Sequence, residues 1–186
     1  MQSGIKRIYY LILLITIGLG ASCGYHLRID GEPLGIEIES IAVPLITSTS
    51  SAKGFEADFT RVIREEFISH SKIPVVGKEK AQMLVKGNIF RIKSDPLSYN
   101  LQQQTVGEKV VTYETTDKRR LQILMEVSLI ERATGKTIWQ DTSLSEEASF
   151  NVGNDPLSND YNQQQALKKI ARLIARRIYL KTMERF

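Results

Sequence analysis

Few side chains in this sequence are of the types that perform catalysis or hold a metal. No second candidate ligand stands near either of the two histidines, His26 and His70, so no metal site is predicted. No histidine accompanies a plausible serine or cysteine nucleophile, and no glycine-rich phosphate loop precedes Lys-Ser or Lys-Thr. The adjacent acids Glu146 and Glu147 lie in a predicted strand, where neighbours face opposite ways, so they make a poor acid and base pair. We therefore expect that the chain is not an enzyme.

The only cysteine, Cys23, stands where covalent modification is expected instead. Two cations, an apolar run over 8–19 and the small residues 20–22 precede it, as in a signal peptide. The apolar run has about 12 residues, against the ~20 that span a bilayer, which disfavours the alternative of a transmembrane anchor. A thiol after Gly-Ala-Ser resembles the lipobox of bacterial lipoproteins, although the preferred leucine three residues before the cysteine is a glycine here. The other alternative is a plain signal peptide with an incidental cysteine.

This segment divides the chain into three parts. We expect a signal peptide over 1–22, a lipidated N-terminus and short tether over 23–35, and one domain over 36–186. The lipid on Cys23 is the only non-protein group expected, and no other cofactor is predicted. Removal of 1–22 would take away two cations and no acids, so the formal charge of +4 would fall to +2. The basicity is thus partly that of the signal peptide and does not indicate nucleic-acid binding.

Hydrophobic periodicity predicts four strands and two amphipathic helices in the domain. The predicted strands cover 36–46, 81–94, 119–130 and 137–150, and the predicted helices cover 54–69 and 159–183. Two helices on one mostly antiparallel four-stranded sheet make a two-layer α+β sandwich. Residues 97–117 are polar and glutamine-rich, and we expect a partly ordered hairpin arm there. Gly87 is expected to mark a β-bulge, and residues 158–160 are expected to cap the last helix.

Three segments of the sequence resemble the LptE family of outer-membrane lipoproteins. Cys23 is followed by Gly24-Tyr25-His26-Leu27-Arg28, which is similar to the family's Cys-Gly-(Trp/Tyr)-x-Leu-Arg start. Residues 40–44 resemble its first strand, and residues 134–139 its strand-connecting turn. The resemblance implies a plug inside the β-barrel protein LptD, help in assembling that barrel, and binding of lipopolysaccharide on its way to the outer leaflet.

Lipopolysaccharide carries phosphates, so its binding surface should present lysine and arginine. The family's contacts fall near the loops at one end of the sheet, which makes the cations around the hairpin arm the candidates. These are Lys109, Lys118, Arg119 and Arg120. The alternative is a solvated strand end. The final helix is a competing basic patch that could meet anionic lipid or an acidic lumen, with solvated surface as its alternative.

The resemblance and the short tether favour a protein that is anchored in the outer membrane and functions there. Gly24 directly follows the cysteine, in the second position of the expected mature chain, where an aspartate commonly marks retention in the inner membrane. A second hypothesis is a periplasmic regulatory lipoprotein, such as an activator of peptidoglycan synthesis. Such proteins usually carry a long tether, whereas the segment from Gly24 to Gly35 reaches at most ~40 Å when extended.

Overall fold

The computed structural model describes residues 37–50 and 54–184. The predicted signal peptide, Cys23 and the tether lie outside the described residues. The elements follow one another as β1 (Ile41–Ala42), β2 (Thr47–Ser48), α2 (Glu56–His70), β3 (Met83–Val106), β4 (Lys109–Glu131), β5 (Thr137–Asn151) and α3 (Pro156–Glu184).

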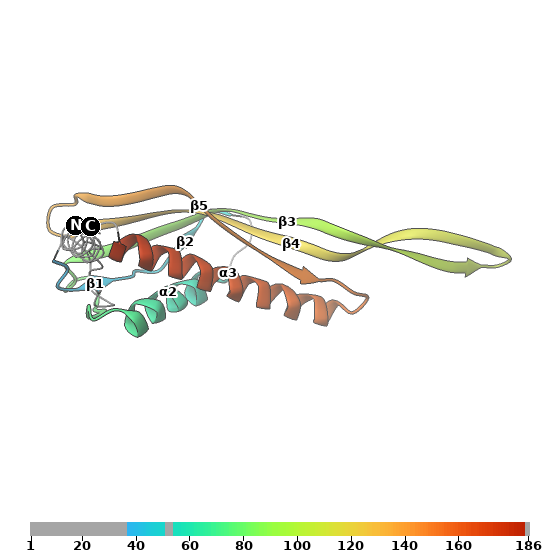
Figure 1. The fold of residues 1–186 in the computed structure, drawn as a ribbon, viewed down its shortest axis with the longest axis horizontal. Helices are drawn as coiled ribbons and strands as arrows, with labels where there is room; N and C mark the ends of the chain where they lie inside the picture. Colours follow the sequence, from blue (N-terminus) through green and yellow to red (C-terminus); the bar gives the residue numbers. More distant parts are fainter. Residues whose placement is uncertain (1–36, 51–53, 185–186) are drawn as a thin grey trace, which may run out of the picture.

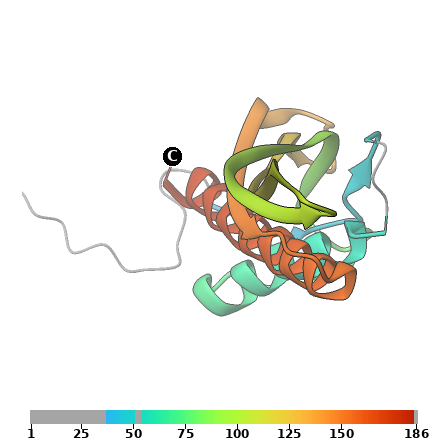
Figure 2. The same ribbon diagram turned by 90° about the vertical axis from the view of Figure 1, so that its right-hand side faces the viewer.

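The predicted two-layer α+β architecture is confirmed. The sheet is mixed and five-stranded, with the order β1-β3-β4-β5 and β2 paired to β3 further along. Both helices lie on the same side of this sheet (Figures 1 and 2). The long strands β3, β4 and β5 pair antiparallel, and the two short strands pair parallel to β3. The sheet has one strand more than the predicted four, because β2 lies just beyond the predicted 36–46 strand, in which only Ile41–Ala42 is assigned as strand.

The interruption between β1 and β2 follows from a mismatch in register with β3. Ile41 pairs with Met83 and Thr47 pairs with Asn88, so this segment has one residue more than the stretch of β3 beside it. Pro44 lies in the gap and has no N–H group to donate to a ladder. The chain therefore leaves the sheet at Pro44 and rejoins it at β2.

The core lies between the helices and one face of the sheet. Odd-numbered residues of β4 from Leu121 to Leu129 are buried, and even-numbered ones are more exposed, which is the alternation of a strand with one covered face. Helix α2 buries one stripe against them and α3 buries another. The stripes consist of Phe59, Ile63 and Phe67 in α2 and of Ile170, Ile174 and Ile178 in α3.

Helix α3 begins three residues earlier than predicted. Its cap is Asp155, whose carboxylate accepts hydrogen bonds from the Ser158 hydroxyl and from the backbone N–H groups of Leu157 and Ser158. These bonds lower the pKa of Asp155. Pro156 then occupies the first helical position, where its missing N–H costs nothing. The expectation that residues 158–160 form the cap was therefore wrong.

Salt bridges attach α3 to both of its neighbours. Arg176 approaches Glu66 of α2 at 3.3 Å, and Arg177 approaches Glu146 of β5 at 2.7 Å. Lys181 donates to Asp141 of β5. Burial alone would raise the pKa of Asp141, but the hydrogen bonds from Lys181 and from the backbone N–H of Ser143 bring it below its ordinary value.

Gly87 does not mark the β-bulge in β3. The register shifts between Ile89 and Arg91 instead, so Phe90 is the extra residue. Gly87 pairs regularly with Val127 and faces the core. A Cβ atom there would lie 2.6 Å from the Cδ1 atom of Ile46 and 2.9 Å from the Cε atom of Met125. Glycine is present because these two core side chains occupy the space of a side chain.

Strands β3 and β4 continue as a two-stranded arm beyond the rest of the sheet (Figure 1). Strand β5 ends at Asn151, opposite Lys118, while pairing between β3 and β4 runs on to Val106 and Lys109. Gly107 closes the turn with a φ of 65°, which glycine adopts without strain. The arm over 97–117 is therefore strand throughout, apart from this turn.

The base of the arm is fixed by one arginine. Arg119 donates from Nε to the Ser94 hydroxyl and from Nη2 to the Ser94 carbonyl, both at 3.0 Å. Ser98 donates to Asp117 across the same strand pair at 2.6 Å. These bonds join β3 to β4 where the register shifts near Pro96.

Substitution of Gly87 tests the close approach in the core. We expect Gly87→Ala to lower the free energy of unfolding by about 1 kcal/mol, because Ile46 and Met125 must move. Gly77→Ala is the matched control, since a Cβ there has no heavy atom within 4 Å. The control should be neutral or stabilising by up to about 1 kcal/mol. Urea unfolding measures both, and equal effects would contradict the packing explanation.

Substitutions at the base of the arm test whether Arg119 stabilises the fold and its neighbour Lys118 does not. Arg119→Ala should lower the free energy of unfolding by about 1 to 2 kcal/mol, because it removes two charge-assisted hydrogen bonds. Lys118→Ala should change it by less than about 0.5 kcal/mol, as exposed sites do. Denaturant titration of the two variants provides the comparison, and a Lys118 variant as unstable as the Arg119 variant would refute the assignment.

Candidate ligand-binding face of the sheet

One face of the sheet carries no helix formed by residues 37–50 or 54–184. On β4 this is the face of the even-numbered side chains, and on β3 it is the face of their register partners. Figure 2 shows both helices on the opposite side. Exposed cations lie along this helix-free face, over both long strands. They are Lys86, Arg91 and Lys93 of β3 and Lys118 and Arg120 of β4.

Two of these five cations are already paired. Lys93 approaches Asp95 at 2.9 Å, and Arg120 approaches Glu147 of β5 at 3.5 Å. Lys86, Arg91 and Lys118 form no salt bridge with any residue in 37–50 or 54–184. Their charges are therefore available to an anionic ligand.

The bulge at Phe90 places Arg91 on this face. Val85, Gly87 and Ile89 face the core, and strict alternation would send Arg91 the same way. The extra residue reverses the alternation, so Arg91 lies opposite Leu124 and is exposed. Phe90 is 37% exposed beside it. The helix-free face thus combines cations with a small apolar area.

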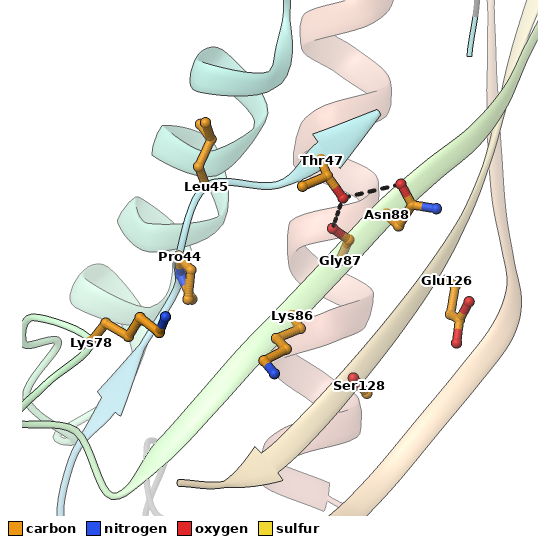
Figure 3. Close-up of a pocket in the computed structure, with 9 residues that line it drawn as sticks. All are labelled: Pro44, Leu45, Thr47, Lys78, Lys86, Gly87, Asn88, Glu126 and Ser128. Atoms are coloured by element: carbon orange, nitrogen blue, oxygen red, sulfur yellow. Dashed lines mark hydrogen bonds between the residues drawn. The ribbon is translucent and has the colours of Figure 1, made fainter. Parts of the chain in front are cut away.

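A groove opens at one end of this face, between the link from β1 to β2 and strand β3 (Figure 3). Its volume is about 390 Å³. Two lysines line the groove (Figure 3). Lys78 comes from the loop before β3, and Lys86 comes from β3 itself. The residues around it are Pro44, Leu45, Thr47, Lys78, Lys86, Gly87, Asn88, Glu126 and Ser128.

Hydrogen bonds fix the link between β1 and β2, which forms one side of the groove, to β3 and to α2. The Thr47 hydroxyl lies 3.3 Å from the Gly87 carbonyl and 3.1 Å from the Asn88 side-chain oxygen. Helix α2 holds the link between β1 and β2 from behind. Its Thr60 hydroxyl accepts from the Ile46 N–H at 2.9 Å, and Arg64 donates twice to the Val43 carbonyl.

The four candidate cations predicted from the sequence do not form one cluster. Lys118 and Arg120 share the helix-free face, but Arg119 points the other way and binds Ser94. Lys109 lies at the tip of the arm, roughly 30 Å along the strand at the usual rise per residue. Sequence reasoning missed Lys86 and Arg91 because no pattern signalled the bulge that aligns them.

The basic side of α3 is divided in a similar way. Arg176, Arg177 and Lys181 are engaged in the salt bridges to α2 and β5. Lys168, Lys169 and Arg172 are exposed, and no salt bridge joins them to another described residue. Three of the six cations of this patch that lie within the described residues therefore hold the fold together.

No group of three or more His, Cys, Asp or Glu side chains in the described residues could hold a metal ion. No helix within 37–50 or 54–184 has the length and apolar character needed to cross a membrane.

Several solved structures are similar to this chain at low sequence identity. A lipoprotein B from Nitrosomonas europaea is 15% identical, with a TM-score of 0.48, and the match covers 86% of this chain and 90% of that one. The rare lipoprotein B from Shewanella oneidensis is 14% identical, with a TM-score of 0.45, over 76% of this chain and 92% of the other. A minor lipoprotein from Acinetobacter baumannii is 11% identical, with a TM-score of 0.45, over 81% and 94%.

Comparison with curated protein sequences gives no match. The family described as "LptE: Lipopolysaccharide-assembly", in contrast, matches residues 38–182, which is well over half of the 186 residues. The match includes all five strands and both helices, except for the last two residues of α3. The chain therefore belongs to the LptE family of lipopolysaccharide-assembly proteins.

Proposed function

We propose that the chain is an outer-membrane lipoprotein that binds lipopolysaccharide and works with an LptD β-barrel. A lipid on Cys23 anchors it to the membrane. The folded domain plugs the barrel, assists the assembly of the barrel, and contacts lipopolysaccharide on its way to the outer leaflet. This role is one of binding and positioning, and it needs no catalytic side chains.

The observation that carries the ligand proposal is the set of unpaired cations on the helix-free face. Lys86, Arg91 and Lys118 have no acidic partner among the described residues. Phosphate oxygens form strong charge-assisted hydrogen bonds with such groups. Phe90 and Leu124 offer apolar contact beside Arg91. An amphiphile with phosphates and acyl chains matches this combination.

The plug proposal is supported by family membership and by the polar character of the helices. Barrel lumens are polar, so a plug needs a polar exterior. The outer side of α2 carries an exposed ion-pair network, in which Arg61 contacts both Asp58 and Glu65. The outer side of α3 exposes Lys168, Lys169 and Arg172. These surfaces suit a hydrated lumen.

Charge reversal tests the ligand face. The variant Lys86→Glu, Arg91→Glu, Lys118→Glu should bind purified lipopolysaccharide at least about tenfold more weakly, since each lost contact is charge-assisted. The matched control is Lys168→Glu, Lys169→Glu, Arg172→Glu, which changes the net charge equally but on α3. Surface plasmon resonance on immobilised lipopolysaccharide measures both. If the control loses as much affinity, binding depends on net charge and the assigned face is wrong.

Isolation from solubilised outer membranes tests the barrel partnership. The tagged full chain should recover a β-barrel protein in a one-to-one complex. The control joins residues 1–35 to an unrelated folded domain, so that it keeps the predicted anchor and loses the LptE-family domain. Recovery of no barrel by the full chain, or equal recovery by the control, would contradict the plug proposal and favour a regulatory lipoprotein.

A further inference from the structure

A second groove, here called the edge groove, lies between helix α2, the link from β1 to β2 and the loop that precedes β3. Its volume is about 390 Å³. Ile68 of α2 contributes to its lining and is 64% exposed. The charged residues of the lining are Arg64 and Lys78, and no acid in the described ranges lines the groove. This composition favours an apolar occupant that also carries negative charge.

The loop before β3 presents an open strand edge beside this groove. Val75 pairs with Ile41 of β1 in parallel. The Ile41 N–H donates to the Pro74 carbonyl, and the Val76 N–H donates to the Ile41 carbonyl. The N–H and the carbonyl of Val75 itself therefore point away from β1, and neither bonds to another described residue. Because Val75 also lines the groove, a chain that paired with it would lie along the groove.

The open edge is too short for most partners. Pro74 has no N–H group, and the chain turns at Gly77, whose carbonyl accepts from Lys80. An added strand would therefore gain about two hydrogen bonds, whereas a specific interface between separate proteins buries about 1,000 Å² or more. The hydrocarbon of a bilayer would leave the backbone groups of Val75 unsatisfied. A segment of the same chain suits a short edge, because its effective concentration is high.

The residues that precede the described chain, 24–36, have a sequence that fits this place. Tyr25, Leu27 and Ile29 alternate with polar residues, which is the pattern of a half-buried strand. The segment also carries two acids, which complement the cations of the edge groove. Residues typical of a turn stand between this pattern and the described chain. They are Gly31, Pro33 and Gly35.

The described chain begins close to the edge groove. Ile38 is buried, and the Glu39 N–H donates to the Gln82 side chain at 2.7 Å, so the chain is already held against the sheet there. From Ile38 to Ala42, which lines the groove, the chain extends by at most ~14 Å. Residues 24–36 reach up to ~45 Å when extended. This length is sufficient for a turn and a strand that returns beside the loop.

We propose that residues 24–36 fold back along the domain, add a short antiparallel strand at Val75 and insert Leu27 and Ile29 into the edge groove. The inference goes beyond the proposed function, because it requires neither a barrel nor lipopolysaccharide. One consequence does rest on that function. If Cys23 carries a lipid, the docked strand holds the lipid against this edge of the domain and fixes which part of the domain faces the membrane.

Amide hydrogen exchange measured by NMR tests the docking. The sample is the expected mature chain, residues 23–186, with Cys23→Ser so that no lipid is attached. The Val75 N–H should exchange slowly in this chain. Leu27→Ser together with Ile29→Ser should make it exchange at least about tenfold faster, because loss of the apolar contacts releases the added strand. Equal exchange of Val75 in the two chains, whether fast or slow, would overturn the inference.

The matched control is His26→Ser together with Arg28→Ser, which alters the opposite face of the same strand. The control should leave exchange at Val75 unchanged, and a tenfold acceleration there would contradict the insertion of Leu27 and Ile29. Slow exchange of the core amides of β4 verifies that each variant is folded.

A photo-crosslinking residue in place of Ile68 gives a second readout. The expected adduct joins position 68 to residues 24–36 of the same chain. An adduct between two chains, or none with residues 24–36, would contradict the inference. These measurements involve no barrel and no lipopolysaccharide, so their failure would leave the proposed function standing.

Discussion

The antiparallel ladder between β3 and β4 determines the rest of the structure. It runs from Met83 and Glu131 to Val106 and Lys109, with register shifts at Phe90 and between Pro96 and Tyr99. Over its first half, two helices cover one face and β5 extends the sheet. Over its second half, no other described helix or strand lies against the ladder. The same pair of strands therefore contributes to the packed core, to the charged open face and to the projecting arm. These three parts differ in which neighbouring elements cover the strands.

The ladder also explains how a small irregularity produces a charged surface. One extra residue at Phe90 turns Arg91 away from the core and aligns it with the cations of the helix-free face. A regular strand would have directed a guanidinium towards the helices, where burial without a partner is costly. The bulge thus serves both the packing of the core and the composition of the open face.

The alternation from Leu121 to Leu129 and the apolar stripe of α2 were sufficient to predict the two layers, because each pattern reports which side of an element is buried. The length of β3 was not predictable in this way. Alternation is limited to Leu97, Tyr99 and Leu101, and the glutamine-rich residues that follow carry none. The segment is strand to its end because β4 lies beside it. Arg91 was missed because a bulge depends on register, which one strand alone does not reveal. The start of α3 could have been predicted from Asp155 followed by Pro156, because an acidic cap before a proline is a stronger indicator of a helix start than the polar residues 158–160.

Lysine footprinting with lipopolysaccharide tests the central assignment most directly, because target and control residues lie in one molecule. Amine-reactive labelling of the folded chain, with and without lipopolysaccharide, is followed by mass spectrometry of each lysine. We expect the ligand to protect Lys86 and Lys118 on the helix-free face, while Lys168 and Lys169 on α3 react at unchanged rates. Protection of the two α3 lysines with continued labelling of Lys86 and Lys118 would contradict the assignment of the ligand to the open face of the sheet.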